Sequence, residues 1–224
     1  MTSVILERRD DQAVLRLALP PVNAMGLALL RDLDAAVAEL VAAPPPRGLV
    51  LTGDGRAFCA GADIKAAPRY TASDWKEIHG LADRAFAALC LLPVPAVAAI
   101  NGHALGGGLI LALTCDLRLA TTTPARFGLP EVAHDIAFPT VPLALVQENL
   151  TPAAQRDLML SGRHVGNAEA VQLGVIDALV PGPELVARAR AMAAERAALP
   201  GFATVKAQLQ RSFRARLAPS ERTP

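Results

Sequence analysis

Short apolar runs alternate with stretches of helical periodicity along the first half of the chain. The runs have the length and character of strands: "SVILER", "AVLRLAL", "GLVLTG", "VPAVAAI" and "DLRLAT". Between them, apolar residues recur at helical spacing from Gly26 to Val41 and again after Ser73, which we expect to cap the second helix. Continuous apolar strands that alternate with helices predict an α/β protein with a largely parallel sheet.

The second half of the chain has a helical texture. Thr151 and Pro152 form a helix start, with a capping residue followed by proline, and Asn167 opens a short helix that Gly174 ends. Two further helices are expected over residues 185–199 and 202–217. We therefore divide the chain into a core, residues 1–182, and a C-terminal helical module, residues 183–224, which could cover a site or an adjoining subunit.

Composition narrows the class of protein. Hydrophobic residues make up 52% of the 224 residues, enough for one domain with a substantial core. A net charge of +1 and only three scattered lysines argue against nucleic acid and charged membrane surfaces as partners. Three cysteines without C-x-x-C spacing suit a reducing compartment and indicate no metal site. The N-terminal residues fit neither a signal peptide nor a membrane anchor, so we expect a cytoplasmic protein.

Many catalytic motifs are missing from the sequence. It contains no phosphate-binding P-loop, no dinucleotide fingerprint and no nucleophile elbow. The four histidines show no metal-ligand pairing, and each is best interpreted as a surface or packing residue. These absences exclude several reaction classes without indicating one.

Two strand-to-turn segments combine small residues with an accessible backbone. They are "FCAGAD", with Ala60, Gly61 and Ala62, and "INGHALGGG", with its three glycines before a helix. Either turn alone is best explained as a tight turn that small residues allow to pack. Two backbone N–H groups that converge on one point would instead form an oxyanion hole, which stabilises negative charge on a carbonyl oxygen.

The two turns stand among segments that resemble the crotonase superfamily, the enoyl-CoA hydratases and isomerases. The resemblance runs from "PPVNAM" through "GLVLTGDGRAFCAGADIK", "VPAVAAINGHALGGGLILALTCDLRLA" and "ARFGLPE" to "AEAVQLGVIDALV", in family order. It implies a spiral of ββα repeats with C-terminal helices that support a homotrimer or a dimer of trimers. It also implies an acyl-CoA thioester substrate, with coenzyme A as part of the substrate and no separate cofactor or metal.

The resemblance assigns roles to particular residues. It implies that the N–H groups of Ala62 and Gly107 bind the thioester oxygen. The stretch from Ala60 to Lys65 would lie along the coenzyme A, so that Asp63, Ile64 and Lys65 join the substrate-binding set. Ile110, two residues after the glycine run, is expected in the same set. Glu131, in "FGLPE", falls on the catalytic glutamate of the family, where a carboxylate can take a proton from the carbon beside a polarised thioester.

One departure from the family pattern bears on the reaction. Enoyl-CoA hydratases carry a second glutamate two residues after the glycine run, where this chain has Ile110. Adding water benefits from two carboxylates, whereas moving a double bond needs one base. The stretch "GLILALTCD" is similar to the Δ3,Δ2-enoyl-CoA isomerase branch, so isomerisation is favoured over hydration. Hydration, thioester hydrolysis, decarboxylation and carbon–carbon cleavage stay open as alternatives.

A second departure follows Glu131. The family usually has glycine four residues later, where this chain has Asp135 after His134. Asp135 is either a relocated second acid or a loop substitution that faces solvent or a neighbouring subunit, and we favour the substitution. A non-catalytic acyl-CoA-binding member is a further alternative, which the retention of Glu131 and both turns disfavours.

Overall fold

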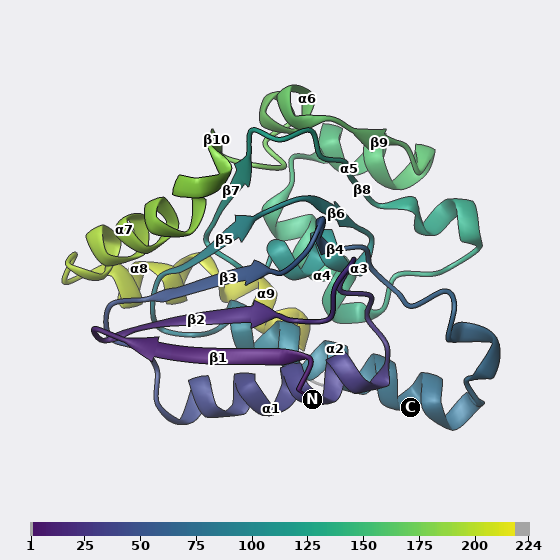
Figure 1. The fold of residues 1–224 in the computed structure, drawn as a ribbon, viewed down its shortest axis with the longest axis horizontal. Helices are drawn as coiled ribbons and strands as arrows, with labels where there is room; N and C mark the ends of the chain where they lie inside the picture. Colours follow the sequence, from purple (N-terminus) through teal and green to yellow (C-terminus); the bar gives the residue numbers. More distant parts are fainter. Residues whose placement is uncertain (1, 218–224) are drawn as a thin grey trace.

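The computed structural model describes residues 2–217, and within them the chain forms two β-sheets surrounded by helices (Figure 1). The first sheet has six strands in the order β1-β2-β3-β5-β7-β10, and the second has four in the order β4-β6-β8-β9. The strand bounds are β1 Val4–Arg9, β2 Gln12–Leu17, β3 Leu49–Gly53, β4 Ala57–Cys59, β5 Ala96–Ile100, β6 His103–Leu105, β7 Leu117–Thr121, β8 Phe127–Gly128, β9 His164–Val165 and β10 Ala178–Val180.

Helices follow the strands along the chain and fill its C-terminal third. The α-helices are α1 Leu27–Ala42, α2 Ala72–Cys90, α3 Gly107–Ala112, α4 Thr140–Asn149, α5 Pro152–Ser161, α6 Asn167–Gln172, α7 Leu185–Ala197, α8 Phe202–Leu209 and α9 Arg211–Leu217. Three short 3₁₀ helices are η1 Ala67–Arg69, η2 Pro130–His134 and η3 Gly182–Glu184. Among the helices within residues 2–217, none combines the length and the hydrophobicity that a membrane span requires.

Strands that follow each other along the chain form pairs, and the two strands of each pair belong to different sheets. In each of the pairs β3/β4, β5/β6 and β7/β8, the first strand joins the large sheet and the second joins the small one. A helix follows each pair, α2 after the first, α3 after the second and the η2–α4 segment after the third. The spiral of ββα repeats that the resemblance implied is therefore confirmed, with β2-β3-β5-β7-β10 parallel throughout.

Both faces of the central strands of the large sheet are buried. Leu15, Leu51 and Ala98 lie on the face that joins the main core beneath α1 and α2, whereas their neighbours Val14, Val50 and Val97 lie on the other. This alternation is the two-residue period of a strand, and burial on both faces explains why these strands read as continuous apolar runs. Figure 1 shows α1 and α2 on one side of the sheet. α7 covers the other face over β3, β5 and β7, where Leu185, Ala189 and Ala193 complete the second core cluster.

The helix starts show how local sequence sets the boundaries. The expected cap Ser73 is wrong, because Thr71 caps α2 and forms a capping box with Asp74. The threonine competes successfully since Asp74 stands three residues after it, at the position that returns the hydrogen bond. Thr151 caps α5 as expected, with proline at the first helical position, and Gly174 follows α6 with a positive φ of 70°.

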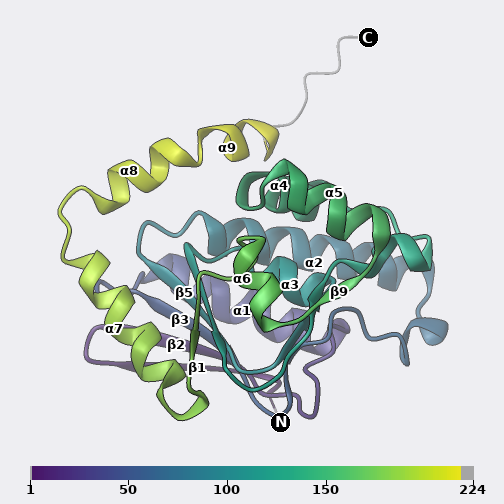
Figure 2. The ribbon, with the colours of Figure 1, turned by 90° about the horizontal axis from the view of Figure 1, so that it is seen from above.

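The chain from Leu199 to Leu217, which includes α8 and α9, forms a C-terminal arm that returns to the core (Figure 2). The single helix expected over residues 202–217 is interrupted at Gln210, which separates α8 from α9. Lys206 of α8 is only 6% exposed, and its Nζ donates hydrogen bonds to the carbonyl of Val94 and to Oδ2 of Asp116, at 3.0 and 2.9 Å. α9 then packs beside α4, with Phe213 inside the main core.

Candidate functional site

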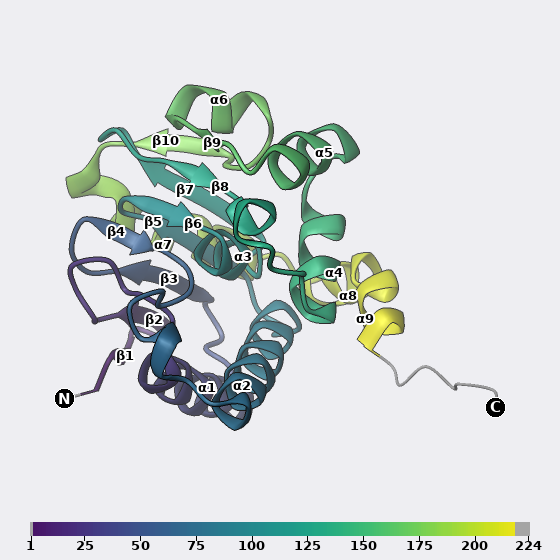
Figure 3. The ribbon, with the colours of Figure 1, turned by 90° about the vertical axis from the view of Figure 1, so that its right-hand side faces the viewer.

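Three neighbouring strands of the small sheet end at the same edge. β4, β6 and β8 run parallel, so their carboxyl ends point the same way, and the segments that follow them lie next to one another (Figure 3). Residues 60–63 follow β4, the glycine run follows β6, and Glu131 stands in η2 directly after β8. A hydrogen bond of 2.9 Å from the N–H of Gly106 to the carbonyl of Gly128 ties the second segment to the third.

The first two turns pack directly against each other. A Cβ on Gly61, whose φ is +81°, would lie 2.6 Å from the carbonyl oxygen of Leu105 and 3.4 Å from the amide nitrogen of Gly107. A Cβ on Gly108 would lie 2.1 Å from the carbonyl oxygen of Cys59. Glycine at these two positions is therefore required by backbone contact between the turns.

The N–H groups of Ala62 and Gly107 are available for a ligand. Ala62 forms a parallel bridge with Met25, in which Met25 donates to the carbonyl of Gly61 and Asp63 donates to the carbonyl of Met25. In such a bridge the N–H of Ala62 points away from Met25. Gly107 opens α3, where a first-turn N–H has no intrahelical partner. Within residues 2–217, neither N–H donates a hydrogen bond to another protein group.

Glu131 has the environment of a proton-transfer group. Its Oε1 would lie 3.1 Å from a Cβ on Gly106, so the carboxylate lies against the second turn. Its Oε2 is buried and has no hydrogen-bond partner among the described residues. Burial raises the pKa of Glu131 from 4.5 to about 7, because a desolvated carboxylate favours its neutral form. A carboxyl group with this pKa can both accept and return a proton near neutral pH.

The remaining predicted ligand residues surround the first turn. Ala60 and Asp63 are half-buried, whereas Ile64 and Lys65 are exposed beside the site. Oδ1 of Asp63 accepts hydrogen bonds from the N–H groups of Lys65 and Ala66, both at 3.1 Å, so this side chain closes its own turn. The structure therefore gives Asp63 a loop-shaping role, and its contact with a ligand stays a prediction.

Ile110 and Asp135 lie in contrasting surroundings. Ile110, on the first full turn of α3, is 3% exposed and belongs to the main core. Asp135 ends η2 in the left-handed conformation, with φ 52° and ψ 40°, and both it and His134 are exposed. The left-handed backbone explains why glycine suits this position and why aspartate, which tolerates that conformation, can replace it.

Sequence reasoning missed the part played by Met25. Its backbone pairs with the first turn, and its Sδ would lie 3.0 Å from a Cβ on Gly107. Met25 therefore contacts both turns at once. The sequence singles out "PPVNAM" only by its resemblance to the family. A second signal for this segment is its one polar residue, which lies between apolar residues just before a helix.

A cavity of about 670 Å³ lies elsewhere, between the C-terminal arm and the core. Its lining includes Cys90, Leu113, Cys115, Val205, Lys206 and Phe213 and no residue of the three turns. Within residues 2–217, no cluster of three or more histidine, cysteine, aspartate or glutamate side chains could hold a metal ion.

Known proteins are similar to this chain in sequence. The family model described as enoyl-CoA hydratase/isomerase matches residues 7–223. The probable enoyl-CoA hydratase EchA8 of Mycobacterium bovis is 32% identical over 85% of this chain and 74% of its own length. The enoyl-CoA isomerase/hydratase Fer4 of Mycosarcoma maydis is 35% identical over 71% of this chain and 61% of its own length.

Solved structures give the same result. A crystal structure of the probable enoyl-CoA hydratase EchA3 of Mycobacterium tuberculosis superposes with a TM-score of 0.87 and 26% identity, covering 96% of this chain and 91% of that one. An apo structure of the same protein, called an enoyl-CoA isomerase, superposes with a TM-score of 0.86 and 27% identity over 96% of both chains. This chain belongs to the enoyl-CoA hydratase/isomerase family of the crotonase superfamily.

Proposed function

We propose that this protein isomerises enoyl-CoA thioesters, moving a double bond from the 3-position to the 2-position. The observation that carries the proposal is the carboxylate of Glu131. Its buried Oε2 has no partner among the described residues, and the group lies against the turn whose neighbouring N–H, that of Gly107, is free. A base of raised pKa beside two free N–H donors suits proton removal next to a carbonyl.

The chemistry needs one base and one oxygen site. The thioester oxygen accepts hydrogen bonds from the N–H groups of Ala62 and Gly107. The Glu131 carboxylate removes a proton from carbon 2, and the electrons of that C–H bond form a dienolate whose negative charge rests on the thioester oxygen. The same carboxyl then returns the proton to carbon 4, which leaves the double bond between carbons 2 and 3. No water, metal or nicotinamide takes part in this balance.

The preference for isomerisation rests on Ile110. An apolar side chain with 3% exposure can neither orient nor deprotonate an attacking water at that position. Hydration of 2-enoyl-CoA is the second candidate, because relatives carry hydratase names and because the exposed residues His134 and Asp135 follow Glu131 at the end of η2. Asp135 would then be the second acid.

The decisive experiment compares both reactions on matched chain lengths. Purified protein is incubated separately with 2-enoyl- and 3-enoyl-CoA, and products are followed by absorbance and mass. Isomerisation leaves the mass unchanged and creates the absorbance of a conjugated enoyl thioester, whereas hydration adds one water and removes that absorbance. We expect isomerisation to be much the faster. Faster hydration would overturn the preference and make Asp135 the leading second acid.

The exposed loop after the first turn is the proposed contact for the coenzyme A moiety. Ala60 and Ala62 present backbone close to the thioester site, and Ile64 and Lys65 have accessible side chains beside it. The Lys65 ammonium suits a phosphate-bearing ligand. Binding of free coenzyme A, measured by calorimetry for wild type and Lys65→Ala, tests this contact, and an unchanged affinity would remove Lys65 from the binding set.

The C-terminal arm is the proposed site of self-association into a homotrimer or a dimer of trimers. Leu199, Val205 and Leu209 expose most of their apolar side chains there, and Leu209 is 76% exposed. Phe213 on the same arm is buried in its own chain, so it forms no part of this proposed contact. Light scattering that reports a monomer at micromolar concentration would contradict this assembly.

A further inference from the structure

The orientation of the Ala62 N–H depends on a neighbouring segment, residues 22–25. The N–H of Ala60 donates to the carbonyl of Val22 at 2.9 Å. Met25 then donates to Gly61 at 2.7 Å and accepts from Asp63 at 3.0 Å. These three bonds bracket Ala62 on both sides, so a shift of residues 22–25 would turn its N–H away from its present direction.

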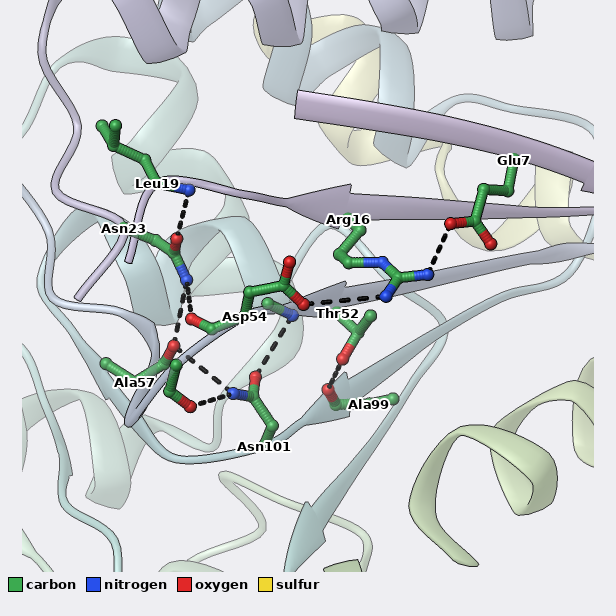
Figure 4. A network of polar contacts seen from close by, with 11 residues as sticks. Glu7, Arg16, Leu19, Asn23, Thr52, Asp54, Ala57, Ala99 and Asn101 are labelled. Carbon is green, nitrogen blue, oxygen red and sulfur yellow. Dashed lines mark hydrogen bonds and ion pairs between the residues drawn. The ribbon is translucent and has the colours of Figure 1, made fainter. Parts of the chain in front are cut away.

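One buried side chain fastens that segment to the core. Asn23 is 0% exposed, and its Oδ1 accepts a hydrogen bond of 2.9 Å from the N–H of Leu19. Its Nδ2 faces three carbonyl oxygens, those of Asp54, Ala57 and Phe58, at 2.9, 3.0 and 3.0 Å. Figure 4 shows the amide between the loop that carries Leu19 and the turn that leads into β4.

The backbone of Asn23 also helps to hold this segment. Its φ of 49° lies in the left-handed region, which asparagine tolerates better than most residues. Its N–H donates to the carbonyl of Leu19, and its carbonyl accepts a hydrogen bond from the buried Cys59 thiol at 3.0 Å. Every side-chain hydrogen bond to residues 19–25 within the described chain involves Asn23.

We propose that Asn23 is a positioning residue for the thioester-oxygen site, because it fixes residues 22–25 and through them the direction of the Ala62 N–H. The inference rests on the proposed function, in which that N–H binds the thioester oxygen. Asn23 touches no reacting atom, and it acts by holding the donor where charge develops in the transition state.

The first test replaces Asn23 by glycine, which keeps the left-handed backbone and removes the amide. The reporter of the oxygen site is 2-butenoyl-CoA labelled with ¹³C at the thioester carbon, whose carbonyl stretch falls in frequency when the oxygen accepts hydrogen bonds. We expect Asn23→Gly to lose much of the downshift seen with wild type. Its kcat for 3-enoyl-CoA should fall about 10²-fold with little change in KM, the size of loss that misplacing a group by about 1 Å produces.

Asn101→Ala is the matched control. Asn101 also bonds the β3–β4 turn, with Nδ2 to the carbonyl of Gly55 at 3.1 Å and Oδ1 to the N–H of Gly53 at 3.2 Å, but it does not reach residues 19–25. We expect Asn101→Ala to keep the downshift and kcat even where its melting temperature falls. An equal loss of downshift in both variants would overturn the proposal, because loosening the β3–β4 turn would then be sufficient.

The remaining outcomes separate the two proposals. A full downshift and wild-type kcat in folded Asn23→Gly would overturn the role of Asn23 and leave the oxygen site intact. No downshift in wild-type protein would overturn the oxygen site itself, and the role of Asn23 with it. If Asn23→Gly does not fold, Asn23→Ser is measured in the same way. There the expected result is a partial loss of the downshift, and a full downshift would overturn the proposal.

Discussion

The two sheets of this protein are built by different means. The large sheet uses strands such as β3 and β5, each of five fully buried residues, held between α1, α2 and α7 by apolar packing. The small sheet uses strands of two or three residues, held by close backbone contact at Gly61 and Gly108 and by the Asn23 amide. The candidate catalytic groups all follow strands of the small sheet.

The large sheet therefore accounts for most of the stability, whereas the small sheet fixes the positions of the candidate catalytic groups. Burial of whole strands supplies most of the hydrophobic stabilisation, since it scales with the apolar area removed from water. Short strands contribute little of that, but their ends are closely fixed relative to one another. Changes in the small sheet should therefore affect turnover most, and the predictions below test that division.

The largest effect should follow from Glu131→Gln. The amide keeps the size of the side chain and removes the base, so isomerisation should fall by roughly 10²–10⁴-fold. Binding of the CoA ester, measured by calorimetry, should stay nearly unchanged because the oxygen site is intact. A variant that retains more than a tenth of wild-type turnover would show that another group moves the proton.

Gly108→Ala should damage the contact between the two turns. Its Cβ would lie 2.1 Å from the Cys59 carbonyl, a backbone atom that cannot move away cheaply, so we expect a loss of about 1–3 kcal/mol in the free energy of unfolding. Gly201→Ala is the control, because nothing lies within 4 Å of a Cβ there. Urea denaturation of both variants checks this, and equal midpoints would show that the turns are not tightly packed.

The raised pKa of Glu131 predicts two opposite pH dependences. Turnover needs the carboxylate, so kcat/KM should rise with pH and level off above about 7. The free energy of unfolding should instead fall as the pH rises, because the native state binds the Glu131 proton more tightly than the unfolded state. The free energy of unfolding should therefore decrease between pH 4.5 and about 7, by on the order of 1–3 kcal/mol.

Glu131→Gln supplies the control for this linkage. The variant has no ionisable group at this position, so it should lose the decrease in the free energy of unfolding that Glu131 causes. Denaturation at pH 5 and pH 8 measures this. An identical pH dependence in the variant and the wild type would assign the effect to other groups.

The smallest effect should come from Asp135→Asn. Asparagine tolerates the left-handed backbone at this position, and the exposed side chain makes no described hydrogen bond, so turnover should change less than about threefold. Steady-state kinetics on 3-enoyl-CoA measures it. A loss of about 10²-fold or more would make Asp135 a second acid–base group.

The sequence predicts the two sheets to different extents. The strands of the large sheet were found because runs such as "GLVLTG" and "VPAVAAI" carry a strong apolar signal. The strands of the small sheet are not predicted by the sequence, since two or three residues are too few to show a periodicity. Glu131 and the free N–H groups were proposed from the resemblance. The packing reason for Gly61 and Gly108 and the role of Asn23 could not be seen, because each depends on contacts between distant segments.

The buried ion pair of Lys206 has a consequence for how the chain reaches its native state. Lys206 bonds to the loop before β5 and to Asp116 before β7, and the Asp116 carboxylate also accepts from the N–H of Ala96. Lys206 thus links the segments that precede β5 and β7, two central strands of the large sheet. During synthesis, this link cannot form until residue 206 has left the ribosome. A chain shortened to residue 200 should accordingly be degraded by protease far faster than the full chain.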